Sequence, residues 1–247
     1  MDKLLYVAMS GAKETLRAQA ANTHNLANAS TTGFKADLSA FQSRAVTGPG
    51  YASRVYATDA TVGWDHGLGA TQQTGNPLDL AVRGQGFFAV QDASGKEAYT
   101  RAGDLHVDPT GQLLTATGLP VMGDNGPISV PPYTSITVGN DGTISIIPLG
   151  QPAQTAANVA RIKLVNPPLS TMQRSADGLF RTTDGTPAVA DASATVASGS
   201  LESSNVDLPG CMVNMIELSR RFDLQVKALH TAEEDGAASA KLLQSSG

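Results

Sequence analysis

The N-terminal part of the chain reads LYVAMSGAKETLRAQAANTHNL over residues 5–26, and this stretch decides half of the fold. Apolar and small side chains recur in it at steps of four and three residues, the spacing of one face of an α-helix. Frequent alanines favour the helix and allow a partner helix to approach closely. The poor helix formers from Asn28 to Gly33 predict that the helix ends there. The face is formed by Leu5, Met9, Ala12, Leu16, Gln19, Thr23 and Leu26.

The C-terminal part of the chain carries a matching pattern. Apolar residues again step by three and four, and this heptad-like register extends to Ala240 and Leu243. Glu217 precedes Arg221 by four residues, which supports a solvent-facing stripe on a helix. The sequence therefore predicts a second long helix over residues 208–247. Its candidate contact positions are Met212, Met215, Ile216, Ser219, Phe222, Val226 and Leu229.

Between these helices, short β-branched runs alternate with turn sequences. The turns, at residues 92–95, 108–111, 124–126, 140–142 and 184–185, supply Asn, Asp or Gly where a hairpin needs positive φ. The expected strands are Leu78–Val82, Phe87–Val90, Leu113–Thr117, Ile136–Val138, Thr143–Ile147 and Arg161–Leu164. An antiparallel β domain over residues 75–185 is the simplest account.

Together these patterns predict an α+β protein in which paired long N- and C-terminal helices, coiled-coil-like, bracket an antiparallel β domain. The expected division is an N-terminal assembly helix over residues 1–35, an extended linker arm over 36–74, the β domain over 75–185, a return arm over 186–207 and a C-terminal assembly helix over 208–247. The two arms are rich in small and polar residues and lack a clean period.

Composition excludes several classes of function. The chain has 17 basic and 22 acidic residues, a net charge of -5, so we expect no nucleic-acid partner. It contains no apolar run long enough to cross a membrane and no visible cleavable signal, so we expect no membrane insertion. With a single cysteine, Cys211, no intramolecular disulfide can form.

No local motif points strongly to a catalytic, cofactor-binding or metal site. The Gly-x-Gly-x-x-Ala string at residues 84–89 runs into a strand-like sequence rather than a helix, so a glycine-kinked hairpin is favoured over a nucleotide site. The four histidines are scattered, which disfavours zinc. The Asp/Gly turns lack the spaced ligands of a calcium loop. Cys211 at a helix start is more simply a packing residue than a reactive thiol. We therefore predict no enzyme activity, no catalytic or metal residues and no cofactor.

The unusual local feature is the recurrence of Asn22, Asn25 and Asn28 just before the helix end. Asparagine is a mediocre helix former because its side chain competes for backbone hydrogen bonds. Two interpretations stay open. The amides are solvated at a fraying helix end, or they hydrogen-bond across a helix contact, where a buried asparagine fixes register.

These residues also carry a resemblance. Asn25-Leu26-Ala27-Asn28 with Thr32-Gly33-Phe34-Lys35 resembles the N-terminal motif of bacterial flagellar rod and hook proteins. The run from Ser204 and Asn205 to Leu208, followed by residues 212–216 and 219–222, resembles their C-terminal motif. Residues 75–82, 84–88 and 99–103 resemble their β domain. The chain is identified as a member of that family, and its first twelve residues and modest length are most similar to proximal-rod members.

The resemblance implies a structural subunit of the flagellar basal-body rod, the drive shaft that crosses the periplasm. It implies export through the flagellar type III apparatus without a cleaved signal peptide, and assembly with copies of itself and with neighbouring proximal and distal rod proteins. The family's terminal helices pack in the inner tube and its β domain faces outward. One departure is Pro209-Gly210, which predicts a later or sharper start of the C-terminal helix than in relatives.

The predicted mechanism is assembly. Leu5, Met9, Leu16 and Leu26 pair with Met215, Phe222, Val226 and Leu229 within or between subunits, each burial contributing about 1.5–3 kcal/mol. A distal-rod or hook subunit is the alternative within the family. A secreted β-rich ligand-binding protein or enzyme is the rival class, and convergent titratable groups in a pocket near Arg101 and Asp104 would favour it.

Overall fold

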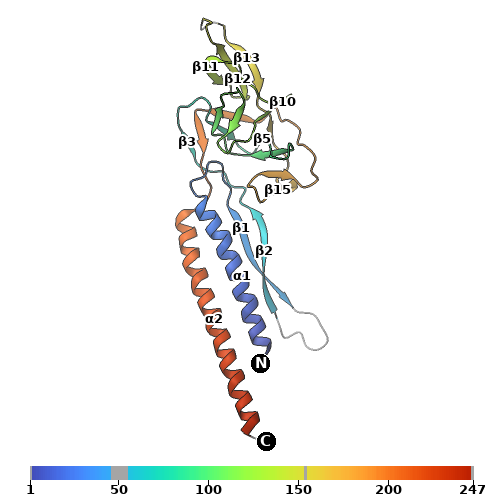
Figure 1. Ribbon diagram of the computed structural model, residues 1–247, viewed down its shortest axis with the longest axis vertical. Helices are drawn as coiled ribbons and strands as arrows, with labels where there is room; N and C mark the ends of the chain where they lie inside the picture. Colours follow the sequence, from blue (N-terminus) through green and yellow to red (C-terminus); the bar gives the residue numbers. More distant parts are fainter. Residues whose placement is uncertain (1, 46–54, 153–154, 246–247) are drawn as a thin grey trace. The chain divides into compact units, whose positions relative to one another are not determined.

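The computed structural model describes residues 2–45, 55–152 and 155–245 (Figure 1). The chain divides into two units. The helical unit comprises residues 1–29, 36–64 and 206–247, and the β unit comprises residues 30–35 and 65–205. Each unit is therefore built from segments that are far apart in the sequence.

Over its described residues, the helical unit contains two helices and one hairpin. Helix α1 spans Asp2–Ala27 and helix α2 spans Leu208–Ser245. Strands β1 (Asp37–Ala45) and β2 (Val55–Trp64) pair antiparallel, with one register shift between Leu38 and Ser39. Helix α1 lies between α2 and this hairpin and contacts both (Figure 1).

The α+β class is correct, but the expectation of two long helices paired as a coiled coil is wrong. Helix α1 has 26 residues against 38 in α2. A coiled coil buries its apolar seam, whereas Met9, Leu16, Met212, Ile216 and Val226 are all exposed. Among the described side chains of α1, those that are buried are instead small or polar: Ala8, Ala12, Glu14, Thr15, Ala18, Asn22 and Asn25. Small side chains let the backbones approach without a continuous apolar seam.

The β unit consists of short antiparallel strands. A five-stranded sheet has the order β14-β5-β6-β16-β15, a three-stranded sheet has the order β11-β12-β13, and four further pairs are β17-β4, β18-β3, β7-β8 and β10-β9. The bounds are β3 Thr71–Gln73, β4 Leu80–Arg83, β5 Phe87–Gln91, β6 Glu97–Thr100, β7 Leu105–Val107, β8 Leu113–Thr115, β9 Met122–Gly123, β10 Gly126–Pro127, β11 Tyr133–Val138, β12 Thr143–Pro148, β13 Ala157–Arg161, β14 Leu164–Val165, β15 Met172–Arg174, β16 Phe180–Thr182, β17 Thr195–Ser198 and β18 Ser200–Glu202, with a 3₁₀ turn at Leu169–Thr171.

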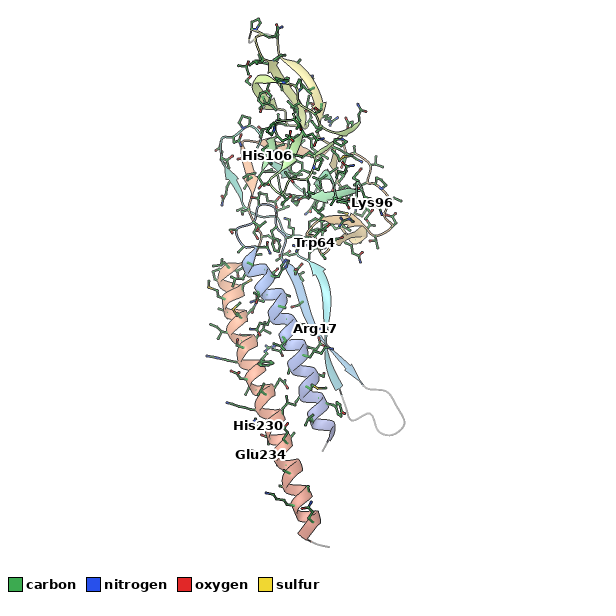
Figure 2. The ribbon with its side chains drawn as sticks, in the orientation of Figure 1. Arg17, Trp64, Lys96, His106, His230 and Glu234 are labelled. Carbon is green, nitrogen blue, oxygen red and sulfur yellow. The ribbon has the colours of Figure 1, made fainter. Side chains whose placement is uncertain are left out.

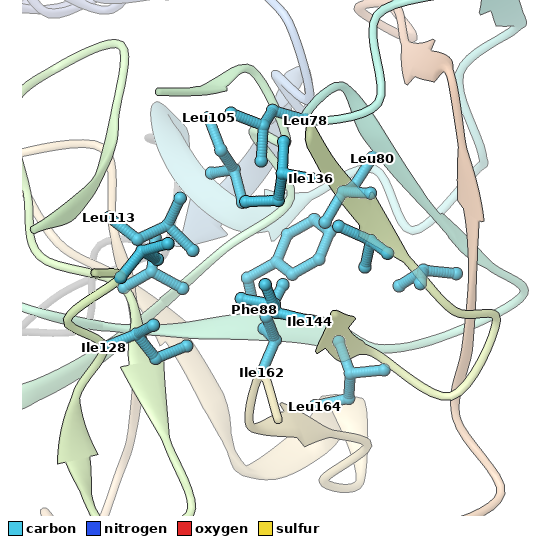
Figure 3. Close-up of a cluster of buried hydrophobic side chains, with 14 of the residues drawn as sticks. Leu78, Leu80, Phe88, Leu105, Leu113, Ile128, Ile136, Ile144, Ile162 and Leu164 are labelled. Atoms are coloured by element: carbon cyan, nitrogen blue, oxygen red, sulfur yellow. The ribbon is translucent and has the colours of Figure 1, made fainter. Parts of the chain in front are cut away.

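The core of the β unit is aliphatic. Phe88 of β5 lies at its centre, surrounded by leucine and isoleucine side chains from the strands around it (Figure 3). These include Leu80, Leu113, Ile144 and Ile162, all of them at most 2% exposed. Buried and half-buried residues alternate along the first part of β12, which is the pattern of a strand with one face on this core.

Several expected elements differ in detail. The segment 36–74, expected as an extended linker arm, contains the β1–β2 hairpin and β3. The expected strand Arg161–Leu164 falls on the break between β13 and β14. Helix α2 begins at Leu208, so Pro209 and Gly210 occupy its first turn, where a missing N–H costs nothing. The Asp207 carboxylate lies where a Cβ on residue 210 would stand, which favours glycine there.

Candidate assembly surface

Large apolar side chains are exposed along both helices. On α1, Tyr6, Met9 and Leu16 are each about half exposed, at 54%, 51% and 49%. Those of α2 are Leu208, Met212, Val213, Ile216, Leu224 and Val226. The remaining residues predicted for assembly include five that are less exposed than this set without being fully buried: Leu5, Leu26, Met215, Phe222 and Leu229. Isolated exposed apolar residues are ordinary, but a run along a helix marks a contact surface.

Charged residues share the helices with this apolar set. Figure 2 shows Arg17 on α1 and His230 and Glu234 on α2. Arg17 is paired with Glu14 at 3.1 Å, one turn earlier on the same helix. Neither helix, as far as it is described, combines the length and apolar character needed to cross a membrane. The exposed surface of the helices thus carries both apolar and charged side chains.

The contact between α1 and α2 is close and partly polar. A Cβ added to Gly11 would lie 2.9 Å from the Gln225 side chain, so glycine leaves room for that glutamine. Among the described side chains of α2, the buried ones are Cys211, Leu218 and Ala232. Burial raises the pKa of the Cys211 thiol, and the Asp207 carboxylate acts in the same direction, which makes the thiolate scarce.

The three asparagines around the end of α1, of which Asn28 follows the last helical residue, have three different roles. The amide of Asn22 donates to the Cys211 carbonyl of α2 at 2.8 Å. Asn25 donates to the Asp37 carbonyl at 2.9 Å and accepts from the Asp37 N–H at 2.8 Å, which fixes the start of β1. Asn28 donates to the His24 carbonyl at the end of its own helix. The cross-helix interpretation therefore fits Asn22. Asn28 does lie at the helix end, but its amide is bonded to the His24 carbonyl there.

Within the β unit, the end of the N-terminal motif, residues 32–35, contacts the segment where the C-terminal motif begins. The Gly33 N–H donates to the Glu202 carbonyl at 2.8 Å, and the Asn205 N–H donates to the Phe34 carbonyl at 3.2 Å. The Asn205 side chain donates to the carbonyls of Asp65 and Gly67. Gly33 adopts φ +67°, which favours glycine. Ser204, next to Asn205, is half-buried.

A buried charge cluster lies beside these motifs. Glu202 receives Lys35 Nζ on Oε1 at 2.7 Å and Arg101 Nε on Oε2 at 2.6 Å, and all three side chains are at most 3% exposed. The remaining Arg101 nitrogens donate to the carbonyls of residues 82, 84 and 86. Burial lowers the pKa of Lys35, and the Glu202 carboxylate opposes that shift. The carboxylate is thus shared by two cations.

The cavity next to this cluster does not resemble an active site. Its volume is about 400 Å³, and Arg101 and Glu202 line it together with residues such as Thr71 and Ala81. The polar atoms of Arg101 and Glu202 are already engaged by protein partners, so they have little capacity left for a substrate. Over the described residues, His, Cys, Asp and Glu form no group of three suited to a metal ion.

Local sequence pattern did not identify the charge cluster, because its members lie far apart in the chain. In the sequence, Lys35 stands out only as part of a resemblance motif. Arg101 lies in another such motif and in the region where a pocket would favour the rival class of function, and Glu202 carries no local signal. A general signal exists: a charged residue inside an otherwise apolar or glycine-rich run is expensive to bury unless it is paired. Finding the partner, however, requires the fold.

Comparison with known proteins finds relatives that match the whole chain. Family models match residues 5–35 (flagella basal body rod protein), 81–146 (flagellar hook protein FlgE/F/G D1 domain) and 197–244 (flagellar basal body rod FlgEFG protein C-terminal). The flagellar basal-body rod proteins FlgF of Escherichia coli K12 and Salmonella typhimurium LT2 are each 44% identical over 252 residues, covering 100% of both chains. FlgF of Caulobacter vibrioides is 36% identical over 98% of both chains.

The chain therefore belongs to the flagellar basal-body rod and hook protein family. Within that family, the relatives that it matches over its full length at 44% identity are FlgF rod proteins. The family is structural rather than enzymatic.

Proposed function

We propose that the chain is a structural subunit of the flagellar basal-body rod that assembles with other rod proteins through the exposed faces of α1 and α2. The observation that carries this proposal is the row of exposed apolar side chains on both terminal helices of a chain whose full-length relatives are rod proteins. A soluble single chain gains nothing from exposing Met9, Leu16, Met212 and Ile216, whereas a neighbouring helix would remove them from water.

The terminal helices and the β unit have separate roles in this proposal. The predicted assembly residues lie on α1 and α2, and the β unit has its own aliphatic core. A unit with its own core does not need neighbours to fold, so it can carry the outward surface of a rod while the helices make the contacts. The half-buried Leu5, Leu26, Met215, Phe222 and Leu229 then complete contacts that the single chain only begins.

The neighbours, the location and the export route of the chain are proposed from the family resemblance. We propose that the neighbours are further copies of this chain and the adjoining proximal- and distal-rod proteins, and that the rod they form crosses the periplasm. We also propose that the chain reaches that place through the flagellar type III export apparatus without a cleaved signal peptide. We further propose that residues 1–35 and 208–247 act as the assembly segments and that residues 75–185 act as the outward β domain.

The test is imaging of basal bodies with a label on this subunit. Leu149 follows β12 and is 71% exposed, so a small tag inserted beside it should not disturb the core. The chain is expressed in a strain that lacks its own copy, and the label's position along the rod is measured. Density at the proximal rod supports the proposal. Density at the distal rod or hook would favour the alternative within the family, and restored motility without label in the rod would contradict both.

A further inference from the structure

The buried cluster of Lys35, Arg101 and Glu202 carries more positive than negative charge. Lys35 and Arg101 bring two positive charges to the single negative charge of Glu202, and all three are removed from water. The excess positive charge is balanced by backbone dipoles. The carbonyl of Gly67 accepts from Lys35 at 2.7 Å, and the carbonyl of Gly86 accepts from Arg101 at 2.7 Å. Removing these charges from water costs free energy, so a net contribution to the stability of the fold does not by itself account for the cluster.

The cluster joins three parts of the chain that are remote in sequence. Lys35 belongs to the short segment that follows α1, Arg101 follows β6, and Glu202 ends β18, just before the segment that leads to α2. Glu202 Oε1 also accepts from the Gly69 N–H at 2.9 Å. One carboxylate is therefore the common partner of groups from each of these segments.

The backbone bonds around the cluster depend on the same residues. The Glu202 carbonyl accepts from Gly33, and the Phe34 carbonyl accepts from Asn205. Arg174 donates to the Lys35 carbonyl at 2.8 Å and stacks its guanidinium 4.3 Å from the centre of the Phe34 ring. Phe34 is the only large apolar residue in the sequence of the segment 30–35. The end of that segment is held by the Lys35 side chain together with the Arg174 bond to the Lys35 carbonyl.

We propose that Glu202 is a positioning residue that holds the segments 30–35 and 203–205 together on the β unit. We call this contact the clamp. Lys35 is the partner of Glu202 whose loss leaves the Arg101–Glu202 ion pair in place. Arg101 and Glu202 form a balanced ion pair that keeps β18 in place. Lys35 then docks the segment that follows α1 onto that preformed carboxylate. The two segments that continue into the terminal helices are thus anchored at one point of the β unit, and releasing one loosens the other.

The experiment is residue-resolved amide hydrogen exchange on the full chain carrying Lys35→Met. This change removes one cation and leaves the Arg101–Glu202 pair balanced, so the β unit retains its fold. The Gly33 and Asn205 amides are expected to exchange at least about tenfold faster. The Ala89 and Gln91 amides, which donate to the carbonyls of Lys163 and Pro120, are expected to stay within about threefold of wild type.

Lys163→Met is the matched control, because Lys163 also forms an ion pair, with Glu97 at 2.8 Å, but lies outside the clamp. It should leave the Gly33 and Asn205 amides unchanged. Unchanged exchange at both amides in Lys35→Met would overturn the proposal. Equal acceleration of all four amides would overturn it too, because Lys35 would then support the whole unit rather than the two segments.

The consequence for the rod rests on the proposed function. Lys35→Met should fail to restore motility in a strain where the wild-type chain and Lys163→Met restore it. Normal motility together with accelerated exchange would overturn the positioning role in assembly. Failure of the wild-type chain itself to restore motility would instead contradict the proposed function, so the two failures are distinguishable.

Discussion

The side-chain amide of Asn22 donates a hydrogen bond of 2.8 Å to the backbone carbonyl of Cys211, joining α1 to the first turn of α2 across 189 positions of the chain. The amide is buried, and the two helices meet there through small and polar side chains. A hydrogen bond of this kind has a definite geometry, so it fixes the register of the two helices where a smooth apolar contact would allow sliding.

Asn22→Ala is expected to destabilise the helical unit by about 1 kcal/mol, because it removes a buried hydrogen bond. Thermal unfolding followed by the helical circular dichroism signal measures the change. The control is Asn214→Ala, the same replacement at an exposed position of α2. Equal effects of the two replacements would mean that the contact with Cys211 contributes nothing specific.

Ile216→Asp is expected to abolish motility while leaving the stability of the single chain within about 0.5 kcal/mol of wild type, since the side chain is 56% exposed. A charge on the proposed contact face would have to be desolvated in the rod. Asn214→Asp carries the same charge on an exposed position two residues away and should retain motility. A motile Ile216→Asp strain would remove this residue from the contact face.

Gly33→Ala is expected to destabilise the β unit by at least about 2 kcal/mol, because it combines a strained backbone with overpacking. Gly33 has φ +67°, and an added Cβ would meet the backbone of Arg101 and Ala102. Gly118→Ala is the control. Its φ is also positive, at 79°, but its Cβ would enter open space, so only the conformational cost of about 1 kcal/mol is expected. Denaturant unfolding of the two variants measures the difference, and similar losses would contradict the close approach to Arg101.

Asp104→Asn is expected to stabilise the β unit at pH 7 by an amount on the order of 1 kcal/mol. Burial raises the pKa of Asp104, Asp79 adds to the shift, and its Oδ1 atom has no hydrogen-bond partner among the described residues. A raised folded pKa means that the wild type gains stability as the pH falls, because the protonated form is favoured in the folded state. The advantage of the variant should therefore shrink between pH 7 and pH 4. An advantage independent of pH would contradict ionisation as its cause.

The two terminal helices show which features of the fold can be predicted from the sequence. The three-and-four spacing from Leu5 to Leu26 predicts α1 correctly, since helix period is a local property. The same spacing does not reveal which neighbour covers the apolar residues. Leu16 and Met212 were expected in a seam and are exposed, because the alanines of α1 and the amide of Asn22 make the contact with α2 instead. A single sequence cannot separate contacts within a chain from contacts between chains.

The β unit shows a similar limit. Strands such as β5 and β12 follow from β-branched and aromatic runs between glycine turns, whereas two- and three-residue strands such as β9 and β18 are too short to leave a pattern. The motif residues Gly33 and Asn205 were identified by resemblance, but their shared anchoring through Lys35 and Glu202 depends on contacts between distant segments. Long-range ion pairs have no sequence period, so only the folded arrangement shows them.

The most direct test of the central claim, assembly through the terminal helices, is rod incorporation of chains that lack residues 1–30 or residues 212–247. Basal bodies are purified from a strain that lacks its own copy of the subunit, and the amount of truncated chain in them is measured against the full chain. The account predicts that both truncated chains are absent from basal bodies and leave cells non-motile, while the β unit retains its strand signal in circular dichroism. Incorporation of either truncated chain with normal motility would contradict it.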